Sequence, residues 1–332
     1  NGKGQFVPVV FKAPRQTERR YPFSLNTGRI RDQWHTMTRT GKTPRLTAHF
    51  AEPFAELNPI DAEKLGIDPA DLVTVKSPYG AVVVRALLTD RVAPGEVFVP
   101  MHWTDQLASK ARIDAVMAPE TDPHSGQPGS KFTPVAVAKA KMAWFGFAVL
   151  RQRPEKIAAD YWALAPVPGG YRLEFAAKSD ADFAETAATL TSSSNETTDI
   201  SDGAAGWRRL AEWRDDVLQA AFFFSASPVE VSRQWACGLL DEGPVSPQER
   251  ARVLAGRVPA DRPDPGALVC SCFQIGCNQI AEAARCGATS VSAIGETLKA
   301  GTNCGSCRSE IQTLLDEIAK ESLDDADIAQ AS

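Results

Sequence analysis

Four cysteines in the last quarter of the chain are spaced as two close pairs. The pattern is Cys270-x-Cys272, then 31 residues, then Cys304-x-x-Cys307. Four thiolates spaced in this way can surround either a tetrahedral zinc ion or an iron–sulfur cluster. Structural zinc sites usually separate paired cysteines by two to four residues, so the C-x-C pair favours a cluster, which spreads its sulfurs over a larger volume. We predict a [2Fe-2S] centre with these four ligands and keep zinc as the alternative.

The remaining cysteines support a metal site rather than a disulfide framework. The chain has seven cysteines, none of them before Cys237, and six lie between Cys270 and Cys307. An odd number, tight clustering and the absence of a secretory segment at the start are typical of metal ligands in a reducing, cytoplasmic compartment. Cys277 and Cys286 are expected to be ordinary thiols.

A second chemical signal lies in a basic segment near the start. Residues 12–45 carry nine basic side chains against two acids, Glu18 and Asp32, in a chain with a net charge of -5. The basic residues are Lys12, Arg15, Arg19, Arg20, Arg29, Arg31, Arg39, Lys42 and Arg45. A solvated basic face is one explanation. A phosphate site is the other, because the segment holds a glycine, arginine forks, hydroxyls and Trp34, which are the groups that a dinucleotide needs.

Composition and periodicity indicate a multi-domain protein. Hydrophobic residues make up 43% and charged residues 23% of 332 residues, and no apolar run is long enough to span a membrane. The net negative charge argues against nucleic-acid binding. We divide the chain into a β-rich domain (1–150), an α+β middle domain (151–256), a linker (257–266), a small all-α cysteine domain (267–320) and an acidic tail (321–332) expected to fray. The polar run Thr191–Asp202 is interpreted as an exposed loop.

Two resemblances sharpen these predictions. Val269-Cys-Ser-Cys-Phe, Gly287-Ala-Thr-Ser-Val and Lys299-Ala-Gly-Thr-Asn-Cys-Gly-Ser-Cys resemble the bacterioferritin-associated-ferredoxin-like [2Fe-2S] domain. The run from Tyr21 to Thr38 resembles the molybdopterin-dinucleotide-binding domain, and so do segments near residues 56–67, 99–106 and 122–131. This second family implies a double-psi β-barrel. The middle segment is similar to the C-terminal domain of flavin reductases.

The molybdopterin resemblance also implies a set of cofactor contacts. The residues assigned by position are Thr27, Gly28, Arg29, Ile30, Arg31, Asp32, Gln33, Trp34, His35, Thr36, His102, Asp114 and Lys131. The family often has asparagine at the position of Asp114, which puts that contact in doubt. His49 is interpreted as structural.

The combination of domains resembles bacterial assimilatory nitrate reductases. It implies reduction of nitrate to nitrite at molybdenum held by bis-molybdopterin guanine dinucleotide. Electrons would come through the [2Fe-2S] centre from ferredoxin, flavodoxin or an NAD(P)H flavoprotein subunit. No cysteine occurs in residues 1–236, so the family's molybdenum ligand and [4Fe-4S] cluster are expected upstream, and we assign no catalytic residue. Alternatives are another molybdopterin oxidoreductase, such as a formate dehydrogenase, or a non-enzymatic [2Fe-2S] protein.

Overall fold

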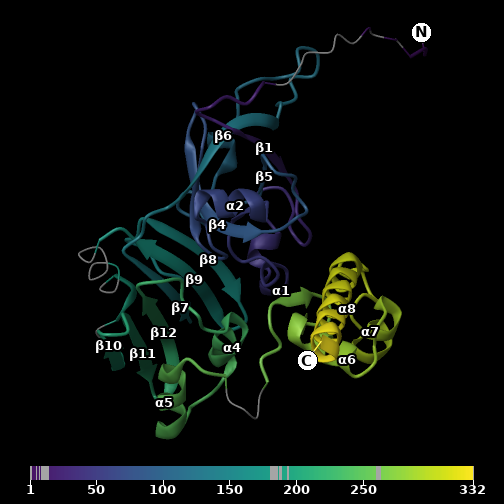
Figure 1. Ribbon diagram of the computed structural model, residues 1–332. Helices are drawn as coiled ribbons and strands as arrows, with labels where there is room; N and C mark the ends of the chain where they lie inside the picture. Colours follow the sequence, from purple (N-terminus) through teal and green to yellow (C-terminus); the bar gives the residue numbers. More distant parts are fainter. Residues whose placement is uncertain are drawn as a thin grey trace.

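The chain forms three bodies that follow one another in sequence. The computed structural model describes residues 2–4, 6, 8, 15–179, 186, 189–192, 194–258 and 263–331. Figure 1 shows a purple and blue barrel, a large teal and green sheet, and a compact group of yellow helices at the carboxyl end. The barrel contacts both other bodies, through Arg31 on one side and Thr47 on the other. Lys12, one of the basic residues singled out above, lies outside the described residues.

The first body is a closed barrel of six strands in the order β1-β5-β2-β4-β3-β6. β1–β5 and β2–β4 pair in parallel, and the other neighbours pair antiparallel. Aliphatic side chains such as Leu25, Leu57 and Val73 are fully buried in its interior. Its strands are β1 (Phe23–Gly28), β2 (Phe54–Leu57), β3 (Leu72–Lys76), β4 (Ala81–Leu88), β5 (Glu96–Pro100) and β6 (Lys131–Lys139). The β-rich first domain is thereby confirmed.

Local sequence explains how the barrel's connections form. Helix α2 (Pro59–Leu65) begins after Asn58, whose side chain accepts a hydrogen bond from the Ile60 amide, and it ends at Gly66, where φ is 63°. The turn at 78–80 joins β3 to β4 as an antiparallel hairpin. The shorter elements of this body are η1 (Thr40–Lys42), α1 (Pro44–Thr47) and η2 (Ile113–Ala115).

The second body is a six-stranded antiparallel sheet in the order β10-β11-β12-β7-β9-β8. Its strands are β7 (Trp144–Leu150), β8 (Tyr161–Val167), β9 (Gly170–Ala177), β10 (Glu196–Asp202), β11 (Trp207–Arg214) and β12 (Val217–Ser225). β7 belongs to this sheet, although the division at residue 150 placed it in the first domain. Every residue of β7 is buried, because the strand is central and has an apolar cluster on each face. In the sequence, the unbroken apolar run of β7 is the feature that indicates a central strand.

β10 corrects the prediction of an exposed loop over Thr191–Asp202. Residues 196–202 pair with β11 along their full length. The strand lies at the edge of the sheet and most of its side chains are exposed, so its Ser, Thr and Asp content concealed it. In the turn that joins β11 to β12, Asp215 and Asp216 take φ values of 52° and 62°. Such positive values suit a two-residue hairpin.

Short helices connect this sheet to the last body. They are α4 (Arg233–Gly238), η3 (Leu239–Asp241) and α5 (Pro247–Ala255). α5 begins with a capping box, in which Ser246 and Glu249 satisfy each other's backbone amides. The expected linker over 257–266 follows, and its residues 259–262 lie outside the described part of the chain.

The last body is small and mainly helical. It contains α6 (Cys277–Arg285), α7 (Val291–Leu298), α8 (Arg308–Ala331) and two short strands, β13 (Leu268–Cys270) and β14 (Ile275–Gly276). The strands mean that the all-α description is not confirmed. Ile280, Ile294 and Ile311 form the centre of its apolar core. α8 continues through residues 321–331, the segment expected to fray, where three alanines favour a helix. Among the helices of the described residues, none has the length and apolar character to cross a bilayer.

Candidate functional site

The structure brings the four predicted cysteines together on two loops. Cys270 ends β13 and Cys272 follows in the turn before β14, while Cys304 and Cys307 lie between α7 and α8. The Sγ atoms of Cys272 and Cys304 are 3.4 Å apart, and all four thiols are free. Cys270 and Cys307 are buried, whereas Cys304 is exposed. One pair of sulfurs therefore faces solvent more than the other.

The surroundings of the sulfurs differ in electrostatic character. The side chain and the backbone amide of Ser306 hydrogen-bond the Cys304 sulfur and lower the pKa of that thiol. Burial, together with the neighbouring Cys270, raises the pKa of Cys307 to about 11, although a backbone amide hydrogen bond from Gly301 acts in the opposite direction. A metal would have to displace these protons, as it does at thiolate sites in general. Amide hydrogen bonds to sulfur, such as the one from Gly301, are among the features that set the potential of an iron–sulfur cluster.

The donor set fits a cluster better than a single ion. Across the described ranges, no three His, Cys, Asp or Glu side chains converge closely enough to hold one metal ion. The sulfurs instead form two neighbouring pairs, with Cys272 beside Cys304 and Cys270 beside Cys307. A two-iron centre is held by four thiolates and spreads them more widely than a tetrahedral ion does. Cys277 and Cys286 lie at the two ends of α6, outside these pairs.

The predicted cofactor loop follows β1 and is pinned by a buried histidine. His102 is fully buried, and its Nε2 accepts a hydrogen bond from the Ile30 amide at 3.0 Å. Its Nδ1 donates to the carbonyl of His35 at the other end of the loop. Burial lowers the pKa of His102, with the nearby Arg29 charge also contributing, so the ring is neutral and can donate and accept at once. His102 therefore fixes the shape of residues 30–35.

The base of this loop is also held from β6. The Lys131 ammonium donates to the carbonyl of Thr27, and the Thr27 hydroxyl donates to the carbonyl of Ser130. A Cβ at Gly28 would lie 3.2 Å from the Phe98 ring and 3.8 Å from the Lys131 nitrogen. The missing side chain thus keeps open the space beside the Lys131 charge.

Some of the residues that were predicted to contact the cofactor are exposed, and others are buried. Arg29 lies over the Trp34 ring at 5.4 Å, and Trp34, His35 and Thr36 are exposed. Gln33 is buried, with its amide 3.3 Å from the carbonyl of Leu46. Only the exposed members are placed to meet a ligand from solvent.

Asp114 lies apart from the loop contacts. It belongs to η2, and its exposed carboxylate is 3.2 Å from the Nε of Arg112. Within the described residues, the structure gives it no contact with residues 27–36. This position was already in doubt from the sequence.

Arg31 and Asp32 bond across to the cysteine body. Arg31 donates to the carbonyl of Val269 at 2.8 Å and to Glu310 at 2.6 Å. The Ser271 hydroxyl donates to Asp32 at 2.9 Å. Sequence reasoning did not foresee these partners, because they lie more than two hundred residues away along the chain.

His49 completes this network. Its side chain is 4% exposed, with Nδ1 3.3 Å from Asp32 and Nε2 3.3 Å from Glu310. Burial acts to lower the pKa of His49, but its contacts with Asp32 and Glu310 outweigh burial and raise it. Burial likewise acts to raise the pKa of Asp32, and the contacts with His49, Ser271 and Arg31 outweigh it and lower the pKa. His49 therefore lies between Asp32 of the barrel and Glu310 of the cysteine body and contacts both carboxylates.

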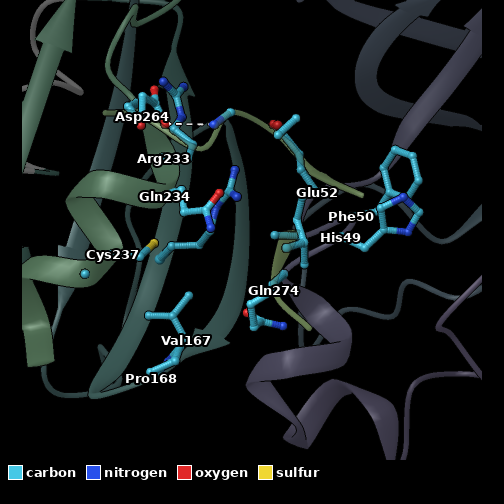
Figure 2. A pocket seen from close by; sticks show the side chains of 18 of the residues that line it. His49, Phe50, Glu52, Val167, Pro168, Arg233, Gln234, Cys237, Asp264 and Gln274 are labelled. Atoms are coloured by element: carbon cyan, nitrogen blue, oxygen red, sulfur yellow. Dashed lines mark hydrogen bonds between the residues drawn. The ribbon is translucent and has the colours of Figure 1, made fainter. Parts of the chain in front are cut away.

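A cavity of about 570 Å³ lies where the three bodies meet. Figure 2 shows His49, Phe50 and Glu52 on its barrel side and Cys237, Val167 and Pro168 across from them. Burial raises the pKa of Cys237 to about 11, so this thiol stays protonated at neutral pH.

A buried ionic network lies beside this cavity. Glu174 is 2.8 Å from Arg233, 2.9 Å from Arg172 and 3.9 Å from Arg85 of the barrel. Arg85 in turn contacts Glu52 at 2.6 Å. These five charges are therefore paired within one network that joins the barrel to the sheet.

Comparisons with known proteins agree with both sites. Residues 23–134 match the model of the molybdopterin dinucleotide binding domain, and residues 268–317 match that of the BFD-like [2Fe-2S] binding domain. The first range spans β1 to β6, and the second contains all four cysteines.

Three curated relatives illustrate the similarity. Nitrate reductase of Klebsiella oxytoca is 37% identical over 316 residues, which is 95% of this chain and 36% of that protein. The assimilatory nitrate reductase catalytic subunit of Bacillus subtilis is 32% identical over 35% of this chain and 16% of its own length. The F420-dependent formate dehydrogenase subunit alpha of Methanocaldococcus jannaschii is 39% identical over 32% of this chain and 16% of its own length. The chain thus spans about a third or less of each.

Proposed function

We propose that this chain is part of a molybdopterin-dependent nitrate reductase, an enzyme that reduces nitrate to nitrite. In this proposal the chain supplies the [2Fe-2S] relay and a pterin-dinucleotide cradle, by which we mean the solvent-accessible residues Gly28, Arg29, Trp34, His35, Thr36 and Lys131. The main support for this proposal is that one nitrate reductase is similar to nearly the whole chain. The Klebsiella oxytoca nitrate reductase matches 95% of the chain, and so includes the barrel, the middle sheet and the cysteine body. The formate dehydrogenase relative matches 32%. The barrel match also speaks against a non-enzymatic [2Fe-2S] protein.

The reaction takes up two electrons and two protons for each nitrate and gives nitrite and water. When bound, the molybdenum cofactor supplies oxygen-atom transfer and the cluster supplies single electrons. The residues of this chain hold and position those groups. We assign no molybdenum ligand, [4Fe-4S] cluster or catalytic residue to this chain.

We assign the cofactor contact to the exposed face of the loop after β1. Gly28 leaves space for a backbone approach, and Arg29 with Trp34 offers a positive charge and a ring face. Lys131 adds a second positive charge next to Gly28. His35 and Thr36 complete this exposed face, because the remaining predicted members turn elsewhere.

His102 is a positioning residue for the cofactor rather than a contact. Its ring has no exposed surface, so a ligand arriving from solvent would not reach it. It acts by fixing the backbone at Ile30 and His35. Such pre-organisation lowers the cost of ordering a loop when a ligand binds.

The finer fold assignments belong to the same proposal. A double-psi barrel is supported by closure with two parallel pairs, β1–β5 and β2–β4. We divide the chain into a barrel domain (15–142), an α+β domain (143–256), a linker (257–266) and a cysteine domain (267–320). Seven cysteines with free thiols, one in the middle body and six in the cysteine body, support the proposal of a reducing, cytoplasmic location. A ferredoxin, a flavodoxin or a flavoprotein subunit is the proposed donor.

The substrate assignment is tested with the full-length enzyme. Reduced enzyme is mixed anaerobically with nitrate, and oxidised enzyme with formate, while cofactor absorbance is followed. We expect nitrate to oxidise the reduced centres and formate to leave the oxidised centres unchanged. Reduction by formate, with no response to nitrate, would reject the proposal.

The cradle is tested by molybdenum content. Arg29→Ala removes the charge stacked on Trp34 and should lower molybdenum occupancy of the purified full-length enzyme. Lys42→Ala, which removes another exposed charge from the same basic segment, is the matched control and should leave occupancy unchanged. Equal occupancy in both variants would contradict the assigned contact.

A further inference from the structure

The contact between the barrel and the cysteine body is a compact set of polar groups. Arg31 donates to the Val269 carbonyl and to Glu310, at 2.8 and 2.6 Å. The Ser271 hydroxyl donates to Asp32 at 2.9 Å. Direct hydrogen bonds therefore join two adjacent barrel residues to three sites on the cysteine body.

Burial makes this contact stronger than an ordinary surface ion pair. The side chains of Arg31 and Asp32 are 16% and 11% exposed, and Glu310 is 36% exposed. His49 lies beneath them and approaches both carboxylates. Charged hydrogen bonds that are partly shielded from water contribute more than exposed pairs, and removing one partner leaves the other desolvated and unpaired.

The contact lies between the two proposed cofactor sites. Val269 and Ser271 flank the ligand Cys270, and Glu310 lies in the first turn of α8, just after Cys307. On the barrel side, Arg31 follows Ile30, whose amide is held by His102. A short series of hydrogen bonds thus connects the residues beside the cluster ligands with the loop that is proposed to bind the pterin.

We infer that Arg31, Asp32, His49, Ser271 and Glu310 form a latch that fixes the [2Fe-2S] domain against the pterin loop in one orientation. Arg31 and Glu310 are then positioning residues for electron transfer, because its rate falls steeply as two centres move apart. The electron-transfer part of this inference rests on the proposed function, whereas the docking part does not.

The test uses the full-length holoenzyme with Glu310→Arg. This change places a second positive charge against Arg31, and Glu310 is neither a cluster ligand nor a cradle contact. Glu282→Arg is the matched control, because Glu282 is exposed on α6 and its ion pair, with Arg285 at 3.8 Å, stays within that helix. Iron content and the electron paramagnetic resonance signal of the reduced cluster show that both variants are folded and loaded.

Two readouts separate docking from electron transfer. We expect amide hydrogen exchange in residues 29–36 and 268–276 to rise about tenfold or more in Glu310→Arg and to stay at the wild-type rate in Glu282→Arg. Oxidation of the pre-reduced cluster by nitrate, followed by stopped flow, should slow by a similar factor. Unchanged exchange in Glu310→Arg would overturn the latch. Faster exchange with unchanged cluster oxidation would overturn its positioning role. If nitrate fails to oxidise even the wild-type cluster while exchange responds, the proposed function fails and the latch stands.

Discussion

The guanidinium of Arg31 lies 2.6 Å from the carboxylate of Glu310, although 279 positions separate the two residues in sequence. Arg31 follows the first barrel strand, and Glu310 lies in the first turn of the last helix. The same guanidinium also reaches the Val269 carbonyl, next to a predicted cluster ligand. A single side chain thus bonds to residues that neighbour both cysteine pairs in sequence.

Replacing Arg31 by lysine should loosen this contact while keeping the charge. A lysine ammonium is a point charge and lacks the planar fork that bonds Val269 and Glu310 together. We expect the loss of about one charged hydrogen bond, roughly 1.5–3 kcal/mol, and hence faster loss of iron to a chelator from the full-length enzyme. Arg39→Lys, at another exposed basic position of the barrel, is the control. Equal chelation rates in the two variants would argue against a protective contact.

Substitution of Cys304 tests the cluster directly. Cys304→Ser should abolish the reducible [2Fe-2S] signal, because the centre requires all four thiolates and Cys304 lies 3.4 Å from Cys272. Cys286→Ser, which changes an exposed thiol outside the two pairs, should keep the reducible [2Fe-2S] signal and the wild-type iron content. Metal analysis and electron paramagnetic resonance of anaerobically purified enzyme give the answer. Stoichiometric zinc in place of iron at this site would mean that the cysteine domain does not transfer electrons.

His102 offers a test of how the cofactor loop is held. His102→Ala leaves the Ile30 amide and the His35 carbonyl without their shared partner. Since unpaired buried polar groups cost about 1–3 kcal/mol each, we expect lower thermal stability and lower molybdenum occupancy. His124→Ala is the comparison, because His124 is exposed in a distant turn. Occupancy at the wild-type level in His102→Ala would show that the loop keeps its shape by other means.

Sequence reasoning succeeded where a signal was local. The two close cysteine pairs predicted one centre with four thiolates, and the structure places the sulfurs of Cys272 and Cys304 3.4 Å apart. It failed where a contact joined distant parts of the chain. Arg31 and Asp32 were grouped with the cofactor residues because they lie within a cofactor motif, and only the fold reveals Glu310 and Ser271 as their partners. No residue pattern near position 31 indicates such a contact.

Glu174 links the stability of the middle sheet to pH. Its side chain is 3% exposed, and burial alone would raise its pKa. The charges of Arg233 and Arg172 outweigh that effect and lower the pKa to about 2. A carboxylate with a depressed native pKa stabilises the fold fully above its unfolded pKa, near 4.3. This stabilisation is lost as pH falls from there toward 2.

Glu174→Gln should therefore destabilise the sheet at pH 7 by roughly 3–5 kcal/mol, because three arginines lose the charge that they share. Unfolding in denaturant can be followed by the fluorescence of Trp213, which is buried in the same sheet. The difference between wild type and variant should shrink as pH falls from about 4 toward 2, since protonation of the wild-type carboxylate has the same effect as the substitution. Glu230→Gln, at an exposed carboxylate of the same domain, should match the wild type at every pH. A wild-type-minus-variant difference that stays constant over this range would mean that Glu174 is not ionised in the native sheet.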